Sequence, residues 1–352
     1  MIRAKFAKFL LDFHRASGTS RGVLRQKETF ILRIQRGDEI GYGECNLFRG
    51  LSTDDCPEYE SKLQWVCDNI NLELAELLRE TMFFPSIQFG LEQAFLSLNS
   101  ANPFHLFSST FVSDQKGIAI NGLIWMGTEE FMLEEIKSKL GKGFDTLKMK
   151  IGAIDFETEV ELLRAIRKDF DSETITLRVD ANGGFKAENA LAKLEVLKEL
   201  DIHSIEQPIA KGEWSSMAEL AGNSPIPIAL DEELIGVFHE RDKRELLESI
   251  RPQYIILKPA LVGGFQGSLS WMRIADDLGI KYWITSALES NIGLNAIAQW
   301  TATLDINLPQ GLGTGSLFKN NINSPLEVEK GYLYYDSKKD WDLTKLENLF
   351  YE

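Results

Sequence analysis

Six charged residues stand at the ends of successive apolar, strand-like segments of this chain. They are, in order, Lys148, Lys150, Asp180, Glu206, Asp231 and Lys258. The segments that carry them follow one another at intervals of about 25 to 30 residues, the length that a strand, a helix and two loops require. In a closed parallel barrel of such units, every strand delivers its C-terminal end to one mouth. We therefore expect three carboxylates to converge there, with lysines on either side.

The three carboxylates predict a divalent-metal site formed by Asp180, Glu206 and Asp231. One acid at a strand end is usually a helix cap, but three at one register would repel one another unless a cation lay between them. Oxygen ligands suit a hard cation, so we expect Mg²⁺, with Mn²⁺ as the second candidate. Zinc is not expected, because the chain has no HExxH motif and no histidine at a strand end beside the acids.

The lysines predict acid–base chemistry. Lys148 and Lys150 are two apart on a strand, so their side chains project to the same side. Paired lysines also protect exposed sheet edges, but a central barrel strand has no open edge. Neighbouring ammonium groups should lower the pKa of at least one of them, which makes a lysine a competent general base. With Lys258 expected on the other side of the metal, the set suits removal of a proton α to a carboxylate.

The elements that position these residues read as a barrel with a separate N-terminal unit. Residues 1–115 combine a strand meander over 1–44, interrupted by the loop SGTSRG, with helices over 57–80 and 86–100. Strands and helices then alternate over 116–319, with seven helices between eight strand positions and a short or irregular eighth strand. We therefore predict an α/β fold: a (β/α)7β modified TIM barrel with an α+β capping domain. A doubly wound open sheet is the alternative architecture.

The positions of two further segments indicate where they pack. Residues 320–352 are expected to form a tail that returns to the capping domain. The loop His14–Gly22, with its Ser17–Ser20 run, is expected to close over the barrel mouth and exclude water, although an inert hairpin loop would have the same composition.

The composition of the chain indicates which classes of partner it can bind. The net charge of −15 argues against nucleic acid, since phosphate binding needs a basic face. No apolar run approaches the length of a membrane span. The three cysteines (Cys45, Cys56 and Cys67) match neither a zinc pattern nor a disulfide framework, so we expect reduced thiols and a cytoplasmic protein. The expected partner is a small-molecule carboxylate, and no oligomeric state is predicted.

At this point the motifs resemble a known family. The KxK at 148–150, Asp180 in DANG, Glu206 in IEQP, Asp231 in LDEEL and Lys258 in LKP are similar to the muconate-lactonizing-type subgroup of the enolase superfamily, over nearly the whole chain. This resemblance implies Mg²⁺ on the three carboxylates, and lysine acid–base residues on the second and sixth barrel strands.

Within the subgroup, the segments SALESNIGLNAIAQ and QGLGTGSLF, and VGGF after Lys258, resemble a lyase branch of menaquinone biosynthesis. Its members dehydrate 2-succinyl-6-hydroxy-2,4-cyclohexadiene-1-carboxylate to 2-succinylbenzoate. The resemblance implies that Lys150 takes the α-proton and later protonates the leaving hydroxyl, that Lys258 stabilises the anionic intermediate, and that Lys148 supports Lys150. The expected substrate contacts are Ser286, Glu289 and Gly311.

Three other functions remain open. An N-succinyl- or N-acylamino acid racemase would use Lys150 and Lys258 as two bases on opposite faces of one carbon. A dipeptide epimerase would present acids near the eighth strand, and no Asp or Glu occurs between Asp305 and Glu327. A non-catalytic binding barrel would leave the paired lysines without a purpose. The GLGTG at 311–315 lacks the residues of a phosphate-binding loop, so we expect it to line the mouth.

Overall fold

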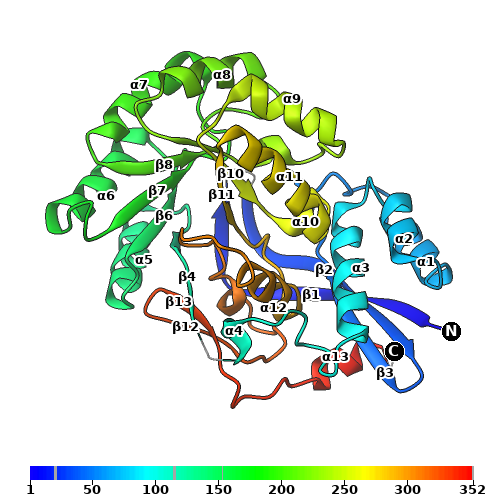
Figure 1. Cartoon of the computed structure of the whole chain (residues 1–352). Coiled ribbons are helices and arrows are strands. Elements are labelled where there is room, and N and C mark those ends of the chain that lie inside the picture. Colours follow the sequence, from blue (N-terminus) through cyan, green and yellow to red (C-terminus); the bar gives the residue numbers. More distant parts are fainter. Residues whose placement is uncertain (20–21, 114–115, 153, 351–352) are drawn as a thin grey trace.

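The computed structural model describes residues 1–19, 22–113, 116–152 and 154–350, and shows a barrel with a cap packed against one flank (Figure 1). The cap begins with an antiparallel sheet in the order β1-β2-β3. Its strands are β1 (Arg3–Thr19), β2 (Gly22–Arg36) and β3 (Glu39–Cys45). Helices α1 (Tyr59–Asp68), α2 (Leu74–Glu80) and α3 (Pro85–Leu98) complete it.

Side chains on the two faces of β2 pack against different parts of the molecule. Phe30, Leu32 and Ile34 face one way and pack in a core with the cap helices. Ile31 faces the other way and joins the main core, which includes the barrel. Because side chains of a strand point alternately to the two faces, both faces of this sheet are buried. The sheet is therefore the layer between the cap helices and the barrel.

The expected SGTSRG loop is instead mostly strand. β1 continues to Thr19 and pairs with β2 through Gly18↔Val23, while the backbone of Gly18 also forms a bridge with Met126. A side chain at Gly18 would collide with the carbonyl of Met126, so glycine here permits a close backbone contact rather than a flexible loop. Residues 20 and 21 lie outside the described residues.

The barrel contains seven parallel strands in the described chain, ordered β11-β10-β9-β8-β7-β6-β5. They are β5 (Gly122–Ile124), β6 (Thr146–Lys150), β7 (Thr176–Asp180), β8 (Ile202–Glu206), β9 (Ile228–Leu230), β10 (Tyr254–Leu257) and β11 (Lys281–Ile284). The eighth position is reduced to two parallel bridges, Thr285↔Gly311 and Ile120↔Gln310. These bridges close the ring between β11 and β5, which excludes the open sheet and matches the predicted irregular eighth strand.

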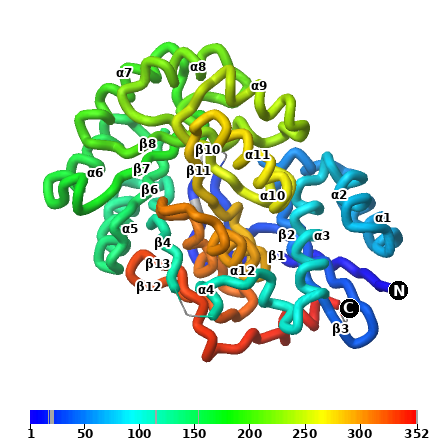
Figure 2. Tube along the Cα trace, viewed as in Figure 1, coloured from blue at the N-terminus to red at the C-terminus, as the bar shows by residue number. Residues whose placement is uncertain are grey.

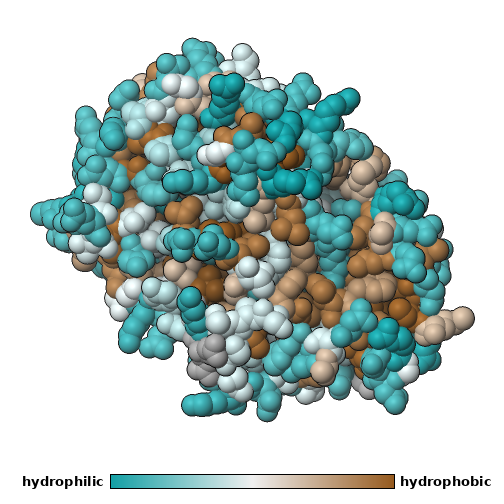
Figure 3. Space-filling model, viewed as in Figure 1, coloured by the Kyte–Doolittle hydropathy of each residue, from teal (hydrophilic) through white to brown (hydrophobic). Residues whose placement is uncertain are grey.

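Helices, most of them amphipathic, surround the barrel. They are α5 (Glu129–Gly141), α6 (Phe156–Asp169), α7 (Ala187–Lys198), α8 (Trp214–Asn223), α9 (Glu240–Ile250), the short α10 (Pro259–Val262), α11 (Gly264–Leu278) and α12 (Asn291–Thr301). In α9, for example, Leu246, Leu247 and Ile250 are buried at helical spacing. The opposite faces give the outer barrel a mostly hydrophilic surface (Figure 3). Within the described residues, no helix is long and apolar enough to cross a membrane.

The tail contacts both units. Strands β12 (Leu326–Glu329) and β13 (Tyr332–Tyr335) form a hairpin that pairs with β4 (Ile118–Ala119), just before the first barrel strand. Beyond it, Trp341 stacks on Phe104 at a ring separation of 4.2 Å, and α13 (Thr344–Asn348) follows. The trace thus ends beside the cap, as Figure 2 shows. A short helix, α4 (Thr110–Ser113), lies between cap and barrel in sequence.

The cysteines are all free thiols, as predicted. Cys45 lies at the end of β3, where its backbone meets α3 closely at Gly90. Burial raises the pKa of the Cys45 and Cys67 thiols, that of Cys67 to about 12. These cysteines therefore pack as small apolar side chains of the cap.

Candidate active site

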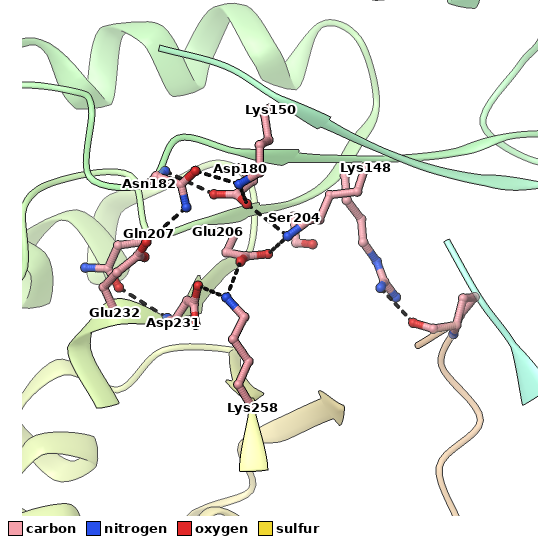
Figure 4. A network of polar contacts seen from close by, with 12 residues as sticks. Lys148, Lys150, Asp180, Asn182, Ser204, Glu206, Gln207, Asp231, Glu232 and Lys258 are labelled. Carbon is pink, nitrogen blue, oxygen red and sulfur yellow. Dashed lines mark hydrogen bonds and ion pairs between the residues drawn. The ribbon is translucent and has the colours of Figure 1, made fainter. Parts of the chain in front are cut away.

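The barrel brings the six charged residues together at its mouth. Lys150, Asp180 and Glu206 are direct neighbours in the ladder of β6, β7 and β8. Asp231 follows the last residue of β9, and Lys258 follows the last residue of β10. Figure 4 shows their side chains pointing toward one another from successive strands. The carboxylates are no more than 2% exposed, so they form a buried floor to the mouth.

Lysine ammonium groups stand between the carboxylates. Lys148 Nζ donates to Asp180 Oδ2 at 2.9 Å and to Glu206 Oε2 at 2.6 Å. Lys150 Nζ donates to the same Asp180 oxygen at 2.8 Å. On the other side, Lys258 Nζ pairs with Asp231 and lies 3.8 Å from Glu206 Oε1. Lys150 and Lys258 therefore flank the carboxylates from opposite sides, as the strand order predicts.

These contacts govern the charge states. Burial acts to lower the pKa of Lys148 and Lys258, but attraction to the carboxylates outweighs it and raises both. The expected fall of a lysine pKa is thus not seen at Lys148. Burial also acts to raise the pKa of Asp180, yet Lys148 and Lys150 bring it well below its usual range. Burial and repulsion from Asp180 raise the pKa of Glu206. The charged form of Glu206 is therefore disfavoured relative to that of an ordinary glutamate.

The residues at this point fit a divalent cation. Three oxygen-donor side chains converge, and Glu206 Oε1 is buried with no hydrogen-bond partner among the described residues. In the described chain, no three acids, histidines or cysteines are already arranged around one ion position. The lysines explain this arrangement, because each carboxylate is turned toward an ammonium group. An ion would be held by Asp180, Glu206 and Asp231 once they turned from the lysines to it.

Two polar residues that orient the carboxylates were not predicted. The backbone N–H of Asn182 donates to Asp180 Oδ1 at 3.0 Å, and its side-chain oxygen accepts from Lys150 at 2.6 Å. Gln207 Oε1 accepts from the backbone N–H of Asp231 at 3.2 Å. Both have positive φ, 43° for Asn182 and 38° for Gln207, which turns the chain sharply at the strand ends. The DANG segment carried the signal for Asn182, whereas nothing in the sequence singled out Gln207.

A cavity of about 440 Å³ opens above this floor. Its wall includes Lys148, Lys150, Asp180 and Lys258, together with a segment from Thr285 to Leu288. The cap contributes Phe48 and Leu51 and, from the long β1 strand, His14, Arg15 and Ala16. Of the segment His14–Gly22 that was expected to cover the mouth, residues 14–16 thus line the cavity. Walls of mixed apolar and polar side chains above a lysine-rich floor suit a small organic carboxylate.

The three expected substrate contacts fall in different places. Ser286 lines the cavity and shares a 2.6 Å hydrogen bond with Thr314. Gly311 also lines it, and a side chain at that position would strike Thr285. Glu289 does not line the cavity in the described structure, since its carboxylate accepts from Ala287 N at 2.7 Å and from Asn46 Nδ2 at 2.8 Å. Its side chain is turned into the junction between barrel and cap.

Comparison with known proteins identifies relatives of this arrangement. Residues 132–339 match the family model of the enolase C-terminal domain-like proteins. The chain is 44% identical to an o-succinylbenzoate synthase of Desulfotalea psychrophila, over 92% of this chain and 96% of the relative. It is 33% identical to an N-succinylamino acid racemase of Thermus thermophilus, but over only 47% of this chain and 42% of that protein.

Solved structures of related proteins also superpose on this chain. The crystal structure of MenC from Desulfotalea psychrophila superposes with a TM-score of 0.84 and 40% identity, covering 95% of this chain and 99% of that one. A muconate lactonizing enzyme from Pseudomonas fluorescens superposes with a TM-score of 0.80 at 20% identity, covering 99% and 98% of the two chains. The second likeness concerns the fold alone.

Proposed function

The chain belongs to the enolase superfamily and, within it, to the o-succinylbenzoate synthase family, and from that premise we propose that it dehydrates 2-succinyl-6-hydroxy-2,4-cyclohexadiene-1-carboxylate to 2-succinylbenzoate in menaquinone biosynthesis. The observation that carries the proposal is the 44% identity over 92% of the chain. The lysines on either side of three buried carboxylates supply the groups that this lyase reaction needs.

Lys150 is the proposed base. A proton leaves the ring carbon next to the carboxylate, and a hydroxide leaves the neighbouring carbon as water. The ring becomes aromatic, and no oxidant or reductant is consumed. Lys150 takes the proton and returns it to the departing hydroxyl, so one amine serves both steps on one face. The hydrogen bonds of Lys150 to Asp180 and Asn182 hold its amine at the edge of the carboxylate cluster.

Lys258 and Lys148 have supporting roles in this proposal. Lys258 reaches the cluster from the opposite side and keeps its charge, since its carboxylate partners raise its pKa. Its positive charge stabilises the anion that forms between proton removal and loss of water. Lys148 is buried between Asp180 and Glu206 and neutralises them beneath the substrate.

Membership of the enolase superfamily implies a divalent metal. We assign Asp180, Glu206 and Asp231 as its ligands and Mg²⁺ as the ion, with Mn²⁺ as a substitute, because the site offers only oxygen donors. When bound, the ion would attract the substrate carboxylate and stabilise negative charge on it.

The free thiols support a cytoplasmic location, where cysteines stay reduced.

The test is product identification with purified protein. The cyclohexadiene substrate should be consumed in the presence of Mg²⁺, and 2-succinylbenzoate should appear in equal amount by chromatography and mass spectrometry. Lys150→Ala protein, checked for folding by circular dichroism, is the matched control and should form product no faster than buffer. If the substrate disappeared without 2-succinylbenzoate, or if both proteins formed it equally, the proposed function would be wrong.

A further inference from the structure

A buried polar cluster joins the cap to one wall of the cavity. Its members come from β2, from β3 and the residue after it, and from the segment between β11 and α12. All are at most 6% exposed. They are Lys27, Glu44, Asn46, Glu289 and Ser290. Charged and amide side chains are rarely buried to this extent unless they are paired, so the cluster has a specific structural task.

The cluster holds the peptide groups of Ala287 on two sides. The N–H of Ala287 donates to Glu289 Oε2 at 2.7 Å, and its carbonyl accepts from Asn46 Nδ2 at 3.0 Å. Asn46 Nδ2 also donates to Glu289 Oε1 at 2.8 Å, and Asn46 Oδ1 accepts from Lys27. Asn46 thus has partners for both ends of its amide. We call Asn46 and Glu289 the clamp, because together they fix one residue of the barrel from the cap.

Glu44 fixes the residues that follow. Its Oε1 accepts from Ser290 N at 2.9 Å, and its Oε2 accepts from Ser290 Oγ at 2.6 Å and from Gly293 N at 2.9 Å. Ser290 is the N-cap of α12, so a carboxylate from the cap meets the amide groups exposed at the start of a barrel helix. The segment is therefore anchored directly after the clamp as well as at Ala287.

The clamped segment is the part of the barrel that walls the cavity. Thr285, Ser286, Ala287 and Leu288 all line it, whereas neither Asn46 nor Glu289 does so among the described residues. Leu288 has a φ of 64°, a left-handed conformation that a branched side chain rarely adopts. Such a backbone persists only where its surroundings enforce it. Here the enforcing contacts are the bonds on the neighbouring residues Ala287, Glu289 and Ser290.

We propose that Asn46 and Glu289 are positioning residues that set the shape of the substrate cavity through the backbone of Ala287 and Leu288. The inference rests on the proposed function of this cavity. It assigns to the cap a second contribution, separate from the residues at the rim of the mouth. It also explains why Glu289, an acid in the segment that walls the cavity, points away from the cavity. Proton transfer does not pass through the clamp, so its loss affects substrate binding more than the chemical step.

The kinetic test uses Asn46→Ala and Glu289→Gln. Asn46→Ala removes the hydrogen bond to the carbonyl of Ala287. Glu289→Gln places an amide donor against the N–H of Ala287 or against Asn46 Nδ2. Either change frees Leu288 to leave its left-handed conformation. We expect KM for the cyclohexadiene substrate to rise about tenfold or more while kcat changes less than about threefold, because the lost interaction acts on binding. Asn46→Ser, which keeps a short hydrogen-bonding side chain, provides a milder variant should Asn46→Ala fail to fold.

Glu92→Gln is the matched control. Glu92 is another buried carboxylate of the cap, and it accepts from the backbone N–H groups of Phe265 and Gln266 at the start of α11. Neither partner lines the cavity in the described structure. This variant alters a buried contact between cap and barrel away from the cavity and should leave KM unchanged. If the clamp variants shift KM no more than Glu92→Gln, the positioning role is wrong.

Hydrogen exchange separates this proposal from the proposed function. The Ala287 amide should exchange faster in both clamp variants than in wild type and in Glu92→Gln, whatever substrate the enzyme uses. Calorimetry with 2-succinylbenzoate should show about tenfold weaker binding to the clamp variants. A wild-type protein that neither turns over the cyclohexadiene nor binds the product contradicts the proposed function alone. Equal exchange of the Ala287 amide in all four proteins would overturn the clamp.

Discussion

At the residue scale, the two lysines that flank the carboxylates have different expected tasks. Lys150 must lose and regain a proton, whereas Lys258 needs only its positive charge. A guanidinium cannot lose its proton near neutral pH but keeps the charge. We therefore expect Lys150→Arg to lose about 10³-fold or more in kcat, as for removal of a general base, and Lys258→Arg to lose less than about 10²-fold.

The measurement is the pair of kcat values with the cyclohexadiene substrate. A racemase would be abolished by either change, because each lysine would serve one enantiomer. Complete and equal loss in both variants would contradict the electrostatic role of Lys258. A surviving Lys150→Arg enzyme would show that the base is another group.

Removal of the metal gives a second test at this scale. Dialysis against EDTA should abolish turnover, and added Mg²⁺ should restore it, because the ion would stabilise the negative charge that forms on the substrate. Asp231→Asn should weaken Mg²⁺ binding, measured by titration of the activity, by at least about tenfold. Full turnover in excess EDTA after dialysis would rule out the metal role.

Residue types and spacing were enough to predict which side chains meet at the barrel mouth. Glu206 and Asp180 become ladder neighbours because successive parallel strands place their last residues side by side. The direction of the Glu289 carboxylate could not be predicted in the same way, since it depends on Asn46, 243 positions away in sequence. Long-range partners of a single polar group leave no local pattern.

At the scale of elements, helix and strand periodicity located the barrel units, and the predicted eighth strand proved to be two bridges. The Gly- and Ser-containing segment near Gly18 was predicted as a loop because its composition is typical of turns. Pairing with β2 and contact with Met126 make it strand instead, and those contacts are tertiary. The single helix expected over 57–80 is two helices, α1 and α2.

The junction between α3 and α11 has a predicted pH dependence. Burial raises the pKa of Glu92 from 4.5 to about 7, although the backbone N–H groups of Gln266 and Phe265 act to lower it. A folded-state pKa above the unfolded value means that this contribution to stability is complete below pH 4.5 and is lost as the pH rises through 7. The lost contribution is on the order of 3 kcal/mol.

Glu92→Gln removes this titration. Urea unfolding at pH 4.5, 6 and 8 should show that the wild-type advantage over Glu92→Gln falls steadily as the pH rises. A difference between the two proteins that stays constant across this range would mean that Glu92 keeps an ordinary pKa.

At the scale of the whole molecule, the cap and the barrel form one site. The β1–β2 sheet buries both faces, and its long hairpin brings His14, Arg15 and Ala16 to the rim of the cavity. Replacing residues 16–23 with a two-residue Asn-Gly turn should lower kcat/KM by about tenfold or more, because water would reach the carboxylate floor. Unchanged kcat/KM would show that the hairpin is inert.

The central claim is that this site dehydrates a ring rather than racemising an amino acid. The direct measurement is kcat/KM, on one preparation of the Mg²⁺-loaded wild-type protein, for the cyclohexadiene substrate and for a panel of N-succinyl amino acids followed by α-proton exchange in D₂O. We predict that the cyclohexadiene value exceeds every N-succinyl value by about 10² or more. An N-succinyl amino acid turned over as well as the cyclohexadiene, or better, would contradict the account.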